Sequence, residues 1–99
     1  MPSLKTKDGR KNVVGLRVRE LRKRMGLSQD ALAAQLQLLG MDGERGVVKR
    51  IENGTRYVND LELQLLVAIF KPHFDYVSYD YLIDNDGWIP GHAQTGNTD

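Results

Sequence analysis

Only a few residues in this 99-residue chain could do chemistry, and they form no recognisable catalytic set. The two histidines, His73 and His92, are far apart in a chain without cysteine, which argues against a zinc site. Residues 84–87, Asp-Asn-Asp-Gly, resemble the start of a calcium loop, but Thr95 stands where its bidentate glutamate is needed. Phosphate-loop and serine-hydrolase motifs are also absent. The sequence therefore predicts no enzyme, no metal site and no cofactor.

Basic residues are concentrated in the first quarter of the chain. Up to Arg24 there are nine lysines and arginines against two acidic residues, and after it five against eleven. This split predicts a polyanionic partner for the basic part, although a solvated basic tail would have the same composition. The lack of cysteine fits a reducing compartment, and no apolar stretch is long enough for a membrane helix or a signal peptide. We expect a cytoplasmic protein with no membrane contact.

Hydrophobic periodicity divides the chain into an arm, one helical domain and a tail. Residues 1–12 are polar, basic and aperiodic, and are expected to form a flexible arm that could reach nucleic-acid phosphates or a minor groove. Residues 13–83 contain the helical patterns and form a single small domain. Residues 84–99 lack a core pattern and are expected to be a partly disordered tail.

Apolar spacing and capping residues predict five helices in the domain. The first covers about 13–24, with Gly26 in a left-handed conformation after it, and the second follows the N-cap Ser28 and has Leu39 on its apolar stripe. The third is expected to begin near residues 42–44 and to end at Glu52. The fourth starts at a capping box of Asn59 and Glu62, stops before Pro72, and is apolar on most sides, which is typical of a centrally buried helix.

The segment after Pro72 allows two interpretations. Ser78 could cap a fifth helix over residues 79–83, or residues 81–83 could pair with Trp88 and Ile89 as a hairpin. The aromatic residues of this region either pack on the fourth helix or form a dimer interface, where tyrosine and tryptophan are enriched. These aromatic residues are Tyr76, Tyr79, Tyr81 and Trp88.

Five short segments occur in an order that matches one known group of helical domains. They are residues 14–22 (Val-Gly-Leu-Arg-Val-Arg-Glu-Leu-Arg), 26–29 (Gly-Leu-Ser-Gln), 32–33 (Leu-Ala), 51–54 (Ile-Glu-Asn-Gly) and 77–82 (Val-Ser-Tyr-Asp-Tyr-Leu). Together they resemble the Cro/C1-type (XRE-like) helix-turn-helix family. The resemblance covers about residues 13–83 and favours a helix over the hairpin at residues 79–83. It implies an all-α, compact bundle of about five helices, lambda-repressor-like, that binds double-stranded DNA as a homodimer.

The resemblance also implies which residues meet DNA. The third helix would lie in the major groove with Glu44, Arg45, Gly46 and Lys49 on its reading face, where arginine suits guanine and glutamate can accept from cytosine. The connection before this helix is longer than in the family, because Ala33 and Val48 are fifteen residues apart instead of about ten.

Other positions of the family pattern touch the DNA backbone or support the fold. Ser28 and Gln29 begin the second helix, where a glutamine and free backbone N–H groups bind phosphate. Arg56 and Tyr57 match positions that contact sugar and phosphate, which position a protein without reading sequence. Arg22 and Glu52 are interpreted as a structural ion pair between the first and third helices.

These observations favour a sequence-specific DNA-binding transcriptional regulator, a repressor of the prophage or bacterial kind. The alternative is a protein-interaction module on the same fold, such as an antitoxin-like or accessory regulator with a protein partner. The longer connection before the third helix and the acidic, aromatic C-terminal region motivate this alternative.

Overall fold

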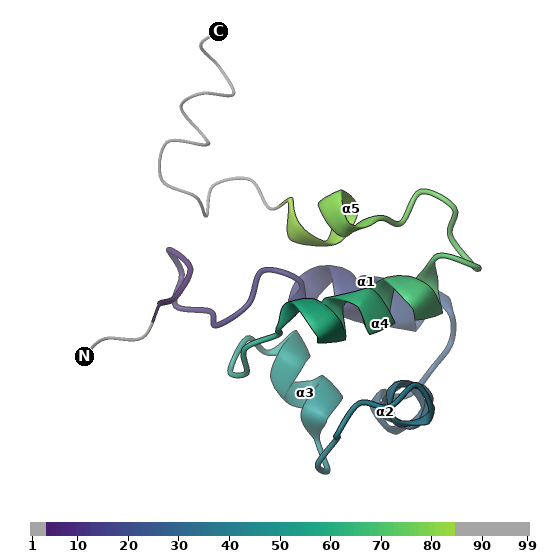
Figure 1. The fold of residues 1–99 in the computed structure, drawn as a ribbon. Helices are drawn as coiled ribbons and strands as arrows, with labels where there is room; N and C mark the ends of the chain where they lie inside the picture. The colour runs from purple at the N-terminus through teal and green to yellow at the C-terminus, as the bar shows by residue number, and fades with distance from the viewer. Residues whose placement is uncertain (1–3, 85–99) are drawn as a thin grey trace, which may run out of the picture.

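The computed structural model describes residues 4–84, which form five α-helices joined by turns and contain no β-strand (Figure 1). The prediction of an all-α bundle of about five helices is confirmed over this range. The predicted tail beyond Asp84 lies outside the described residues. The helices are α1 (Gly15–Arg24), α2 (Gln29–Leu38), α3 (Val47–Glu52), α4 (Asp60–Phe70) and α5 (Tyr79–Ile83).

Three helices begin at the side chains that the sequence indicated. The Ser28 hydroxyl accepts from the Ala31 N–H at 3.0 Å, and Ser78 caps α5 in the same way. At α4, Asn59 accepts from the Glu62 N–H at 2.8 Å while the Glu62 carboxylate accepts from the Asn59 N–H at 3.1 Å. Each cap supplies a partner to a backbone donor that the first helical turn leaves unpaired.

The third helix starts later than predicted. It begins at Val47, and Gly46 precedes it with a φ of +81°, a left-handed conformation that no other residue type adopts as readily. The Arg50 guanidinium also lies against Gly46, where an added Cβ would be only 3.1 Å from Arg50 Nη1. The predicted start near residues 42–44 is therefore wrong, and Glu44, Arg45 and Gly46 belong to the connection that precedes α3.

The connection between α2 and α3 does not continue the helix α2. The helix α2 ends at Leu38, and Gly40 follows with a φ of +102°. Met41 then turns inward and is 7% exposed, whereas Leu39, which the periodicity placed on the apolar stripe, is 48% exposed. The extra residues therefore form a turn that contributes Met41 to the core.

One hydrophobic core contains side chains from all five helices. In Figure 1 α4 crosses in front of α1 with α5 above them, and α4 packs on α2 and α5. The fourth helix was expected to be centrally buried, but only one side of it is buried, and Leu61 on the other side is 68% exposed. The fully buried core side chains are Phe70, Leu21, Leu32, Leu36, Ile51, Leu66, Leu82, Val18, Val47, Val48 and Val77.

The segment after α4 is helical at residues 79–83, so the hairpin alternative is wrong for its first strand. Its second strand, with Trp88, lies outside the described residues. The Tyr81 ring packs edge-on to Tyr76 with centroids 5.2 Å apart, and the Arg17 guanidinium of α1 lies 4.2 Å from the Tyr81 centroid. Tyr81 thus joins α5 to α1, whereas Tyr76 and Tyr79 remain largely exposed.

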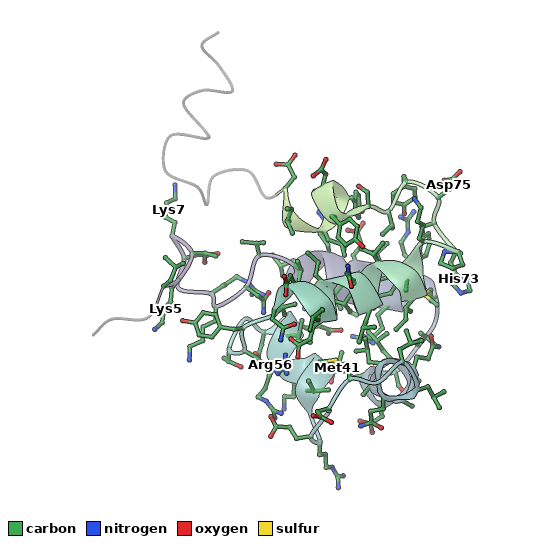
Figure 2. All side chains as sticks on the ribbon, viewed as in Figure 1. Lys5, Lys7, Met41, Arg56, His73 and Asp75 are labelled. Atoms are coloured by element: carbon green, nitrogen blue, oxygen red, sulfur yellow. The ribbon has the colours of Figure 1, made fainter. Side chains whose placement is uncertain are left out.

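The N-terminal segment, residues 4–12, lies beside the loop between α3 and α4, at the opposite side of the molecule from the α4–α5 connection (Figure 2). The Lys11 N–H donates to the Gly54 carbonyl at 2.7 Å, and the Tyr57 hydroxyl donates to the Leu4 carbonyl at 2.8 Å. Asn12 is buried. Residues 10–12, which the sequence assigned to a flexible arm, thus hydrogen-bond to the end of α3 and to the loop after it.

Among residues 4–84, no helix has the length and apolar character that crossing a bilayer requires.

Phe70 occupies the centre of the core and is 0% exposed. Its replacement by alanine leaves a cavity, so we expect Phe70→Ala to lower the free energy of unfolding by about 3–5 kcal/mol. Leu38→Ala is the control, because Leu38 is 87% exposed and its loss should change stability by less than about 0.5 kcal/mol. Urea denaturation followed by circular dichroism measures both. Equal effects of the two substitutions would contradict this description of the core.

Candidate nucleic-acid interface

A buried ion pair joins α1 to the end of α3. Arg22 Nε donates to Glu52 Oε2 at 2.6 Å and Arg22 Nη2 donates to Glu52 Oε1 at 3.0 Å. The two side chains are only 10% and 4% exposed. These hydrogen bonds raise the pKa of the Arg22 guanidinium above its ordinary value, and burial acts in the opposite direction. The predicted pairing of Arg22 with Glu52 between the first and third helices is thus present.

The same pair organises the start of α2. Arg22 Nη1 donates to the Leu27 carbonyl at 2.8 Å, which fixes the turn between α1 and α2. Gln29 Nε2 donates to Glu52 Oε1 at 3.1 Å. The Gln29 side chain therefore braces α3 through Glu52, while Ser28 caps α2 with its hydroxyl. Both residues have structural contacts at the place where the family pattern expects phosphate.

Two further residues, which sequence reasoning missed, also hydrogen-bond to the end of α3. Arg10 Nη2 donates to the Glu52 carbonyl at 2.8 Å. Asn12 Nδ2 donates to the carbonyls of Ile51 at 3.0 Å and Arg56 at 2.7 Å, and Asn12 Oδ1 accepts from the Gly15 N–H at 2.9 Å. Asparagine side chains often accept from a backbone N–H a few residues further on, as Asn12 does from Gly15, and this tendency is the only signal for Asn12 in the sequence.

Four of the predicted DNA contacts surround one hollow between α2 and α3. This hollow has a volume of about 200 Å³. Arg45 and Lys49 are exposed, and no partner for either side chain is found among residues 4–84. Gln29 and Gly46 complete the set of predicted residues that the hollow brings together. Its lining is Gln29, Asp30, Ala33, Arg45, Gly46, Val47, Val48 and Lys49.

Glu44, in the connection before α3, lies apart from this hollow and pairs with Arg50 of α3. Its carboxylate lies 2.9 Å from Arg50 Nη2, close enough to pair although the atoms are not aligned as a hydrogen bond. Arg50 Nη1 donates to the Arg45 carbonyl at 3.1 Å. Gly46 therefore serves the approach of Arg50. Among the predicted reading residues, Glu44 has a side chain that is 73% exposed, and its carboxylate neutralises the Arg50 cation.

Arg56 and Tyr57 lie in the loop between α3 and α4, outside the hollow, and have partners within the chain. Arg56 donates to both carboxylate oxygens of Glu62, at 2.9 and 2.8 Å. This bidentate hydrogen bonding lowers the pKa of Glu62 and raises the pKa of Arg56. Tyr57 is 46% exposed, and the Lys11 ammonium lies 5.5 Å from its ring centroid. Arg56 thus fixes the start of α4 and the Tyr57 ring faces the N-terminal segment.

Basic side chains form two groups around α3. One group is Arg45 and Lys49 at the hollow, and the other is Lys5, Lys7 and Lys11 of the N-terminal segment, beside the α3–α4 loop. No cluster of three or more metal-ligating side chains is present between residues 4 and 84. His92, the other histidine of the chain, lies outside the described residues.

Comparison of the chain with protein-family models, with curated proteins and with solved structures finds no match.

Removal of the Glu52 charge tests the structural role of the Arg22–Glu52 ion pair. Glu52→Gln leaves the Arg22 guanidinium buried without its counter-charge, and we expect the free energy of unfolding to fall by about 3–5 kcal/mol. Glu44→Gln is the matched control, because its ion pair with Arg50 is exposed and should contribute less than about 1 kcal/mol. Urea denaturation of both variants gives the comparison. A loss for Glu52→Gln no larger than that for Glu44→Gln would contradict the structural role of Arg22 and Glu52.

The lowered pKa of Glu62 makes stability depend on pH. Its folded-state pKa is below its ordinary value of 4.5, so the unfolded chain takes up this proton first as the pH falls. The contribution of Glu62 is therefore complete above about pH 4.5 and is lost as the pH falls through the folded-state pKa. We expect the stability difference between the native chain and Glu62→Gln to shrink over that window. The control is Glu20→Gln, at an exposed position of α1. In urea titrations its stability difference from the native chain should stay constant over the same pH window.

Proposed function

We propose that this protein is a sequence-specific DNA-binding transcriptional regulator, a repressor that acts in the cytoplasm as a homodimer. The observation that supports it most directly is the hollow between α2 and α3, where Arg45 and Lys49 are exposed and unpaired within residues 4–84. Cations that have no internal partner are available to base edges and phosphates. Arg45 can donate a bidentate pair to guanine, and Lys49 of α3 lines the same hollow.

The basic N-terminal segment supports the same proposal. Lys5 and Lys7 extend the positive charge of Lys11 along one side of the molecule (Figure 2). Hydrogen bonds through Arg10, Lys11 and Leu4 hold this segment to the α3 end and to the following loop. A basic segment in a fixed position contributes phosphate contacts, which add affinity without sequence preference and weaken with salt.

The internal contacts change the roles proposed for two backbone-contacting residues. Gln29 and Arg56 already donate to Glu52 and Glu62, so their contribution to DNA binding is to hold the surface in place. Arg45 and Lys49 are the proposed reading residues. Glu44, which pairs with Arg50, limits the positive charge beside them.

The second candidate function is a protein-interaction module of the antitoxin-like or accessory kind. Leu38 and Leu39 favour it, since they are 87% and 48% exposed at the longer connection between α2 and α3. Adjacent exposed leucines are typical of a surface that another protein covers. In that case, purification under native conditions recovers the chain with a stoichiometric partner, and Leu38→Asp abolishes the association without changing affinity for DNA.

Selection from a random duplex library, followed by titration of the enriched sequence, tests the proposed function. We expect Arg45→Ala to lower affinity for the selected sequence by about 1–3 kcal/mol and to relax the preference at one base pair. Lys23→Ala is the control, because Lys23 is an exposed cation of α1 outside the hollow. Its effect should be small and equal for selected and random DNA. Equal affinity of the native chain for selected and random duplexes would refute sequence-specific binding.

A further inference from the structure

A second hollow lies on a different face, between the N-terminal segment, the start of α4 and the end of α5. Its volume is about 330 Å³ and its surface is mostly apolar. Three of its apolar side chains are exposed to solvent, Leu4 for the most part at 80%, and Tyr57 and Ile83 in part at 46% and 39%. We call this hollow the N-terminal groove. Its lining is Leu4, Lys5, Thr6, Arg10, Lys11, Asn12, Val13, Val14, Tyr57, Val58, Asn59, Asp60, Leu63 and Ile83.

We propose that the N-terminal groove is the docking site for this chain's own C-terminal segment, with Trp88 and Ile89 in contact with its apolar wall. The proposal concerns a different surface from the α2–α3 hollow and does not depend on DNA binding. Three observations select this occupant over an external one.

The first observation is continuity of the chain. Ile83 is part of the groove wall, and the sequence continues from it with only four residues before Trp88. Five residues span at most about 18 Å when fully extended, so the chain tethers Trp88 within that distance of Ile83. A short connection gives the side chain a high effective concentration at the groove, which a separate molecule would lack.

The second observation is the pattern of the segment itself. Trp88 and Ile89 are adjacent and are the only large apolar residues from residue 85 to residue 99. A pair of this kind matches an apolar wall that already contains Tyr57 and Ile83. Burial of these two side chains would cover apolar surface that the described residues leave exposed.

The third observation is charge complementarity. The groove contains Lys5, Arg10 and Lys11 against the single acidic residue Asp60. Residues 84–99 contain three aspartates and no lysine or arginine. Asp86 lies two residues before Trp88, so docking of Trp88 carries that carboxylate toward the basic N-terminal segment, where the opposite charge favours it.

Trp88 is the only tryptophan of the chain, so its fluorescence reports on this segment alone. In the full chain we expect emission at a shorter wavelength than that of free N-acetyltryptophanamide, and acrylamide quenching several-fold weaker. Leu4→Ser and Ile83→Ser should each increase the quenching, while Leu38→Ser, an equally exposed leucine on α2, should not. Lys5→Glu should increase it as well, and Lys23→Glu serves as its control. Circular dichroism verifies that each variant retains its helices.

Quenching of Trp88 in the native chain as strong as that of the free compound would overturn the proposal. The proposal also fails if Leu4→Ser and Ile83→Ser leave the quenching unchanged, since Trp88 would then be protected elsewhere. Protection that disappears on dilution, together with a concentration-dependent mass, would place Trp88 in the groove of a second copy and likewise overturn it. None of these readouts depends on DNA, so failure here leaves the proposed function untouched.

Discussion

The buried ion pair of Arg22 and Glu52 is the contact on which the other features of this fold depend. Two opposite charges removed from water are tolerated only when both are fully hydrogen-bonded. Arg22 therefore uses its guanidinium on Glu52 and the Leu27 carbonyl, and Glu52 also accepts from Gln29. One contact thus fixes α1, the turn after it, the start of α2 and the end of α3. The orientation of α3, a helix of only six residues, follows from it.

The end of α3 is also where the N-terminal segment attaches. A short helix leaves most of its carbonyls without helical partners, and those at its end must be satisfied from outside. Arg10 and Asn12 donate to the Glu52 and Ile51 carbonyls, and Asn12 also reaches the Arg56 carbonyl. These hydrogen bonds bring a basic segment, distant in sequence, to the loop after α3. The wall of the N-terminal groove exists because of this attachment.

Cations near the candidate interface fall into two groups according to their partners. Arg22, Arg50 and Arg56 each face a carboxylate, so their charge is neutralised within the fold. Arg45 and Lys49 face the hollow between α2 and α3. The proposed function rests on this second group. A count of charges along the chain cannot separate the groups, because it does not show which cation faces a carboxylate. The Arg22–Glu52 pair joins residues far apart in sequence, and the pairs of Arg50 with Glu44 and of Arg56 with Glu62 depend on the turns that flank α3.

The sequence by itself determined the elements whose causes are local. Ser28, Asn59 and Ser78 start their helices because a side chain within three residues satisfies the orphan backbone donors. The Arg22–Glu52 pair was also expected, although only from a family resemblance. Tertiary structure alone decided the start of α3, where Arg50 packs on Gly46, and the burial of Met41 in place of Leu39. It also decided that residues 10–12 hydrogen-bond to the end of α3 and to the loop after it. The burial of Met41 and the contacts of residues 10–12 join separate segments, and the start of α3 depends on where the Arg50 side chain packs. A local pattern of residue types does not contain such contacts.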